Sequence, residues 1–77
     1  MTKKRIIITK HAEERALQRG VSIEDIRETI DKPSKKDPRT GNIQKFKRIV
    51  DKRTNNVIVE IKGNDLIVVT TWWKDEK

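Results

Sequence analysis

His11, the only histidine of this 77-residue chain, is followed at helical spacing by Arg15 and Arg19. Residues three, four and seven apart meet on a helix surface, so these three side chains and Gln18 are expected to form one polar stripe. The helix dipole near a first turn favours a neutral imidazole, which can act as a general base towards a ribose 2′-hydroxyl. A guanidinium group can hold a phosphate through two hydrogen bonds. The stripe therefore predicts chemistry on a phosphodiester.

The same residues also have structural interpretations, which the sequence leaves open. His11 could simply hydrogen-bond the adjacent strand or loop. Arg15 and Arg19 could form ion pairs with Glu14 or with the acidic second helix. A single histidine, the absence of cysteine and three isolated glycines argue against a bound metal, thiolate chemistry and a phosphate-cradling glycine loop. We therefore predict no metal and no cofactor.

A second group of cationic side chains lies in residues 33–54, where positive charge is concentrated as it is in residues 1–20. On a strand, Lys45 and Lys47 share one face, whereas Arg48 points the other way with Phe46. With a formal net charge of +7, we expect the group to contact phosphates in a salt-sensitive, mostly non-specific way. The alternative is an ordinary solvated surface. The candidate nucleic-acid-binding residues of this group are Lys35, Lys36, Arg39, Lys45, Lys47 and Arg48.

Two threonines and two tryptophans, residues 70–73, close the last predicted strand. The hydroxyl of Thr70 or Thr71 could contact a phosphate oxygen. Because neighbouring strand residues face opposite ways, one tryptophan is expected to enter the core and the other to be more exposed. Trp73 is the candidate for stacking against an unpaired base. The alternative is that both tryptophans cover a small core.

The elements that position these residues read as an α+β fold. We predict a short strand over residues 4–8, a helix that Thr9 caps and that runs to about Arg19, and a second helix over residues 23–32. Gly20 is expected to end the first helix, and Ser22 with Asp25 to form a capping box. Residues 33–42 are expected to be a loop. A three-stranded antiparallel meander follows over residues 43–50, 57–61 and 66–73, with turns at 51–56 and 63–65, and one sheet results.

Length and composition indicate what class of protein this is. We predict one domain over residues 1–77, with 73–77 as a candidate flexible tail. Charged residues make up 40% of the chain and apolar residues 32%, but the apolar residues are grouped in periodic runs that favour a folded domain. The run of isoleucines at 6–8 is too short for a membrane span or a signal peptide. With no cysteine, a reducing, cytoplasmic location is expected, without a membrane partner.

The stretch from Thr9 to Ser22 resembles the opening of the domain of unknown function 4258 family, with its His-Ala pair, an arginine four residues after the histidine and an Arg-Gly turn. Phe46, the two hairpins and residues 68–73 are similar to that family's strand-rich end. By fold, the family is grouped with small ribonucleases and toxins of the barnase-like, colicin-like and toxin–antitoxin types. The resemblance implies metal-independent RNA cleavage through a 2′,3′-cyclic phosphate. It also implies that His11, Arg15 and Arg19, with Thr70 or Thr71, carry the site.

Three functions follow as hypotheses. The first is an RNA-directed ribonuclease of toxin type, in which His11 is the base and Arg15 and Arg19 hold the scissile phosphate. No second histidine and no tyrosine is present to protonate the leaving group, and Lys45 or Lys47 could do so only if its pKa were lowered. The second hypothesis is a non-catalytic nucleic-acid-binding module, with RNA favoured. The third is a domain whose basic face docks an acidic, antitoxin-like protein.

Overall fold

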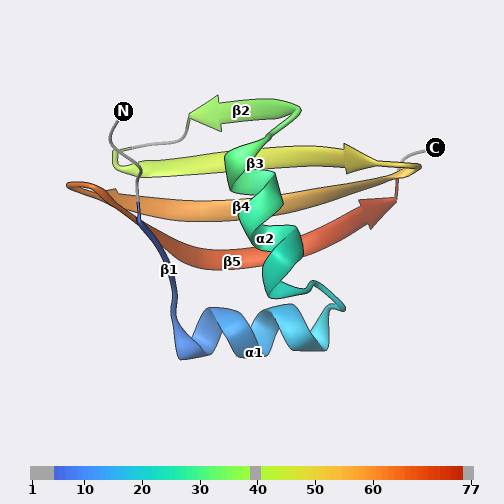
Figure 1. The fold of residues 1–77 in the computed structure, drawn as a ribbon, viewed down its shortest axis with the longest axis horizontal. Coiled ribbons are helices and arrows are strands. Elements are labelled where there is room, and N and C mark those ends of the chain that lie inside the picture. Colours follow the sequence, from blue (N-terminus) through green and yellow to red (C-terminus); the bar gives the residue numbers. More distant parts are fainter. Residues whose placement is uncertain (1–4, 39–40, 76–77) are drawn as a thin grey trace.

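The computed structural model describes residues 5–38 and 41–75, and within them two helices accompany one sheet (Figure 1). The elements in chain order are β1 (Arg5–Ile8), α1 (Lys10–Gln18), α2 (Ile23–Asp31), β2 (Lys35–Pro38), β3 (Ile43–Val50), β4 (Arg53–Lys62) and β5 (Asp65–Asp75). β5 continues through Asp75, so residues 73–75 of the predicted tail are strand. Arg39, one of the predicted binding residues, lies outside the described residues.

α1 begins and ends at the predicted signals. The Thr9 hydroxyl accepts a hydrogen bond from the Ala12 N–H at 3.1 Å and caps the helix. At the other end Gly20 has φ +69°, and the Val21 N–H donates to the carbonyl of Ala16 at 2.8 Å. This pattern is a Schellman motif, in which a residue in the left-handed region closes the last turn. The chain is thereby turned back so that Val21 is buried.

α2 has the predicted capping box. The Ser22 hydroxyl accepts from the Asp25 N–H at 3.0 Å, and the Asp25 carboxylate accepts from the Ser22 N–H at 3.2 Å. Ile26 and Ile30, which are four residues apart on one face of the helix, are buried, but Ile23 is 42% exposed. The third buried position of the helix is Thr29 instead, because a hydroxyl can be buried when it finds a hydrogen-bond partner.

Within the described residues the sheet has five strands in the order β1-β5-β4-β3-β2, so the predicted three-stranded meander is an incomplete description. The meander is present as β3, β4 and β5. β1 joins it as a fourth strand, parallel to β5, with Ile6 opposite Leu66 and Ile8 opposite Val68. β1 pairs with residues 65–68, and within the described part of the chain no strand pairs with the rest of β5 on that side, which we call its free edge.

The prediction of a loop over residues 33–42 is wrong, because residues 35–38 form β2, antiparallel to β3. The Ser34 N–H donates to the carbonyl of Lys47 at 2.7 Å at the start of this pairing. The first three residues of β2 are charged, and the strand therefore lacks the alternation of apolar and polar residues by which a strand is recognised. Pairing with β2 gives hydrogen-bond partners to backbone groups of β3 that would otherwise lie at the edge of the sheet, and the lysines of β2 protect the new edge from pairing with another strand.

The predicted turn over residues 51–56 is also too long. The chain reverses at residues 51–52, where Asp51 has φ +56°, and β4 begins at Arg53. Asn55 and Asn56 are therefore strand residues, with exposed fractions of only 1% and 2%. Their turn propensity is overridden by partners elsewhere in the chain, since Thr29 of α2 contacts Asn55 at 2.7 Å.

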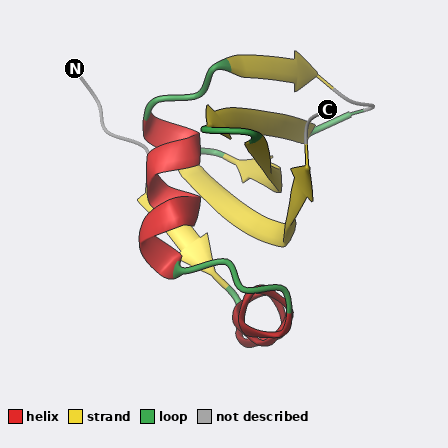
Figure 2. Ribbon diagram, turned by 90° about the vertical axis from the view of Figure 1, so that its right-hand side faces the viewer, coloured by secondary structure: helices red, strands yellow, loops and turns green. Residues whose placement is uncertain are grey.

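Both helices lie on the same side of the sheet. In Figure 2 α2 runs along one face of the sheet, α1 lies near β5 at one end, and the opposite face carries no helix of the described chain. The core fills the space between α1, α2 and the covered face. Its buried apolar residues are Ala12, Ala16, Val21, Ile26, Ile30, Phe46, Val57, Val59, Leu66 and Val68. We call the opposite face the open face.

Candidate functional site

His11 and Arg15 lie together on the exposed side of α1. With Glu14 and Gln18 they line an open hollow, while Ala12 and Ala16 on the other side of the helix are buried. This grouping is the one that the helical spacing predicts. Within the described residues, neither His11 nor Arg15 makes a side-chain hydrogen bond or an ion pair. The alternative in which Arg15 forms an ion pair with Glu14 is therefore not seen among the described residues, and both groups can contact a ligand.

Arg19 does not share this hollow, although the sequence places it in the same stripe. It is the C-terminal cap of α1, and its guanidinium turns towards the free edge of β5. One guanidinium nitrogen donates to the Thr70 hydroxyl and to the carbonyl of Thr71, both at 3.2 Å. The structure thus brings together Arg19 and Thr70, two of the predicted site residues. It assigns His11 and Arg15 to a neighbouring surface of the same helix.

A second open hollow surrounds Arg19 at this edge. It is lined by Arg19, Arg53, Thr70, Trp72, Trp73 and Asp75. The Arg53 guanidinium lies 4.6 Å from the centre of the Trp73 ring and 3.5 Å from the Asp75 carboxylate. The Trp73 indole N–H donates to the carbonyl of Gly20 at 3.2 Å and so fixes the α1–α2 turn to β5. Neither Arg53 nor Trp72 was predicted as a site residue, because their proximity to Arg19 depends on how α1 docks.

A β-bulge determines which way the two tryptophans face. Val68 pairs with Val59, but Thr70 pairs with the preceding residue, Ile58, so Val69 has no partner on β4. The extra residue reverses the alternation of β5 beyond this point. Strict alternation from Val68 would turn Trp72 inward and Trp73 outward. In the structure Trp73 packs against the core instead, and Trp72 lies on the open face.

The predicted basic residues on β2 and β3 are divided between the two faces. Lys35, Lys45 and Lys47 lie on the open face, where Lys35 is opposite Lys47. The Lys45 ammonium is 5.2 Å from the centre of the Trp72 ring, within the range of a cation–π interaction. Lys47 lies 3.2 Å from the Asp37 carboxylate, and this hydrogen bond lowers the pKa of Asp37 below its ordinary value of 3.8.

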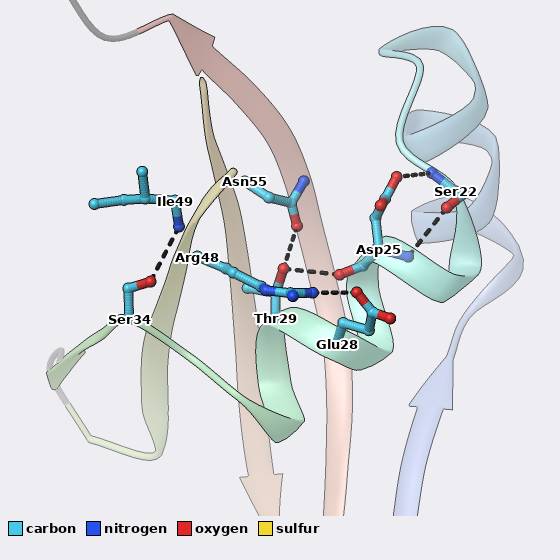
Figure 3. A network of polar contacts seen from close by, with 8 residues as sticks. All are labelled: Ser22, Asp25, Glu28, Thr29, Ser34, Arg48, Ile49 and Asn55. Atoms are coloured by element: carbon cyan, nitrogen blue, oxygen red, sulfur yellow. Dashed lines mark hydrogen bonds and ion pairs between the residues drawn. The ribbon is translucent and has the colours of Figure 1, made fainter. Parts of the chain in front are cut away.

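Lys36 and Arg48 lie on the helix-covered face instead. Arg48 forms an ion pair with Glu28 of α2, and the two are drawn in Figure 3 within the network that also contains Thr29 and Asn55. Lys36 lies 5.9 Å from the centre of the Phe46 ring. These two contacts hold α2 and β2 against β3. The structure therefore gives both residues a structural role. Their contacts with nucleic acid remain predictions.

A family model described as Domain of unknown function (DUF4258) matches residues 8–73. The chain belongs to this family. No curated protein and no solved structure matches the chain at a significant level. The DUF4258 match spans both hollows apart from Asp75, and it also spans β3 and β4. The residues that the structure assembles around α1 and β5 are thus part of the family domain.

Two further properties of the DUF4258 domain concern metals and membranes. Among residues 5–38 and 41–75, no three His, Cys, Asp or Glu side chains are grouped closely enough to hold a metal ion. Within the same residues, neither helix is long and apolar enough to cross a bilayer. The charged side chains that line the two hollows are arginines, Glu14 and Asp75.

Proposed function

We propose that this protein acts on RNA and cleaves it without a metal ion. The observation that carries the proposal is the shared hollow of His11 and Arg15 on α1, where both side chains are exposed and lack protein partners within the described residues. A general base and a phosphate-binding guanidinium on one surface are the minimum that transesterification of RNA requires. The family resemblance leads to the same reaction.

In the proposed reaction the His11 imidazole accepts the proton of a ribose 2′-hydroxyl. The 2′-oxygen then forms a bond to the adjacent phosphorus, and the bond from phosphorus to the 5′-oxygen of the next nucleotide breaks. The products are a 2′,3′-cyclic phosphate and a 5′-hydroxyl, whose proton comes from solvent. Arg15 holds the phosphate and stabilises the charge that develops on its oxygens.

The remaining cationic side chains would bind the flanking strand. Arg19 is held at the end of the same helix by Thr70 and Thr71, one and two turns from Arg15 and His11 along α1. A cation is favoured there by the C-terminal end of the helix dipole. The net charge of +7 favours association with a polyanion, and such association weakens as salt is added.

Cleavage of labelled single-stranded RNA in the presence of a chelator tests the proposal. We expect products with 2′,3′-cyclic phosphate ends, no cleavage of the 2′-deoxy strand, and loss of about 100-fold or more in rate for His11→Ala. Arg15→Ala should also lose activity. Arg27→Ala is the matched control, because Arg27 is an exposed arginine of α2 outside both hollows. If His11→Ala cleaves as fast as the parent protein, the proposed mechanism is wrong.

A second function, non-catalytic RNA binding, is favoured by the lysines of the open face, which lie on strands rather than on α1. It predicts a binding constant whose logarithm falls with the logarithm of salt concentration by about 0.7 per neutralised phosphate. It also predicts no products and an equal affinity for His11→Ala. Tight binding of an acidic protein, with no competition by RNA, would contradict both functions and support a protein-docking surface.

A further inference from the structure

The open face of the sheet carries a line of side chains that leads from the edge strand to Trp72. Successive strands place Lys35 opposite Lys47, Lys47 opposite Asn56, and Asn56 opposite Trp72. Adjacent strands are about 4.8 Å apart, so the line from β2 to β5 is roughly 14 Å long. Asn56 is buried in the middle of this line, where its side-chain N–H donates to the carbonyl of Thr54 at 3.2 Å. The line therefore has cations at one end and an indole at the other.

The charge of this face favours an anionic partner. Its cationic side chains include Lys35, Lys45 and Lys47. Its two carboxylates on β2 and β4 are already paired, Asp37 with Lys47 at 3.2 Å and Glu60 with Lys62 at 3.8 Å. At the β5 end of the line, Arg19 and Arg53 line the hollow that also contains Trp72. Cationic side chains thus lie on both sides of Trp72, the lysines towards β2 and the two arginines at β5, and each group can bind a phosphate.

Trp72 is half-buried, but it is not among the residues that pack against the core. The bulge at Val69 turns it away from the core, and Lys45 lies over its ring at 5.2 Å. An indole with a nearby cation is a preferred surface for an unpaired nucleobase, since stacking and cation–π contacts combine. A base in a duplex has both faces covered by its neighbours and offers no such contact. The partner that fits this surface is therefore a single strand.

We propose that the open face binds single-stranded RNA, with one unpaired base stacked on Trp72 and the backbone phosphates on the surrounding lysines and arginines. This inference rests on the proposed action on RNA and adds the substrate class: unpaired rather than duplex RNA. It also extends the bound strand from α1, past the free edge of β5, onto the sheet. Cleavage at His11 is not required for it.

Tryptophan fluorescence tests the stacking directly, because the chain has two tryptophans and no tyrosine. Trp73→Phe leaves Trp72 as the only tryptophan, and Trp72→Phe leaves Trp73. The probe is an unlabelled strand of twelve 2′-O-methyl uridines. Its blocked 2′-oxygen prevents cleavage during the titration. We expect the strand to quench the emission of Trp73→Phe much more strongly than that of Trp72→Phe. Trp73 lines the same hollow, but it packs against the core and its indole N–H donates to the carbonyl of Gly20, so no base can stack on it as on Trp72.

Affinity gives a second readout that does not depend on emission. In fluorescence anisotropy with a labelled strand of the same sequence, Trp72→Ala should bind about tenfold to 100-fold more weakly than the parent protein. Trp72→Phe should retain most of the affinity, because a phenyl ring still stacks. Binding of an RNA duplex of equal length should be weak and unaffected by either change. Circular dichroism and thermal unfolding confirm that each variant is folded.

The outcomes separate this inference from the proposed function. If the strand binds by anisotropy but the emission of Trp72 does not change and Trp72→Ala binds normally, stacking on Trp72 is overturned while action on RNA stands. If quenching is seen but RNA is never cleaved, the ribonuclease proposal fails and the single-strand surface stands. Equal affinity for duplex and single strand overturns the assignment of substrate class. No binding of either form overturns the RNA partner and with it this inference.

Discussion

Replacing Thr71 by valine should stabilise the protein. Thr71 is completely buried on β5, opposite Val57, and its hydroxyl finds no hydrogen-bond partner within the described residues. Burying a hydroxyl without a partner costs about 1–3 kcal/mol, and a methyl group of nearly the same shape removes that cost. Valine and threonine have similar strand propensities, and the Thr71 carbonyl that accepts from Arg19 is unchanged. We therefore expect a gain of about 1–2 kcal/mol in the free energy of unfolding.

Thr29→Val is the matched control for Thr71→Val. Thr29 is equally buried, but its hydroxyl lies 2.7 Å from both the Asp25 carbonyl and the Asn55 side-chain oxygen (Figure 3). The same change should therefore destabilise the protein by about 1–3 kcal/mol, because it leaves the buried side-chain oxygen of Asn55 without its donor. Urea unfolding followed by circular dichroism measures both effects. A shift of 1 kcal/mol corresponds to about 4–8 °C in melting temperature for a domain of this size. A loss of stability in Thr71→Val similar to that in Thr29→Val would refute the reasoning.

Two further predictions concern the edge strand and the second helix. Because hydrogen bonding to Lys47 lowers the pKa of Asp37 in the folded state, this pair stabilises the protein above the ordinary pKa of 3.8 and loses that effect as pH falls through the lowered value. The carboxyl carbon resonance of Asp37 should titrate below pH 3.8, and Lys47→Met should move the midpoint upward; an unchanged midpoint would contradict the pairing. Ser22→Ala should cost about 1 kcal/mol in urea unfolding, through loss of the cap of α2, whereas Ser22→Gly should cost only a few tenths. Equal losses in the two variants would argue against the capping hydroxyl.

The helices could be predicted because their signals are local. Thr9 and Ser22 lie next to the N–H groups that they cap, and Gly20 supplies the left-handed conformation at its own position. The grouping of His11 with Arg15 follows from the same helical spacing. Features of this kind require no knowledge of the rest of the chain.

The parts that could not be predicted depend on residues far apart in the sequence. β2 exists because β3 offers it backbone partners, and the residues of β2 show no apolar alternation that would reveal this. Asn55 is a strand residue because Thr29 meets it from α2. Arg19 joins Thr70 only because α1 docks at the free edge of β5, 51 residues further along the chain. Sequence periodicity contains no information on any of these long-range contacts.

The bulge at Val69 explains why the core and the open face both depart from the expected pattern. Without it Thr71 would face outward, and Thr70 and Trp72 would face the core. With it, Trp73 replaces Trp72 against the core and a threonine enters a position between apolar neighbours, where its hydroxyl has no partner. A substitution to valine would relieve that defect at almost no change in shape. The threonine thus has a cost in stability, and the same shift of register places Thr70 beside Arg19 and Trp72 beside Lys45. If this surface binds RNA as we propose, the unpartnered hydroxyl of Thr71 is a loss of stability that accompanies the placement of the binding residues.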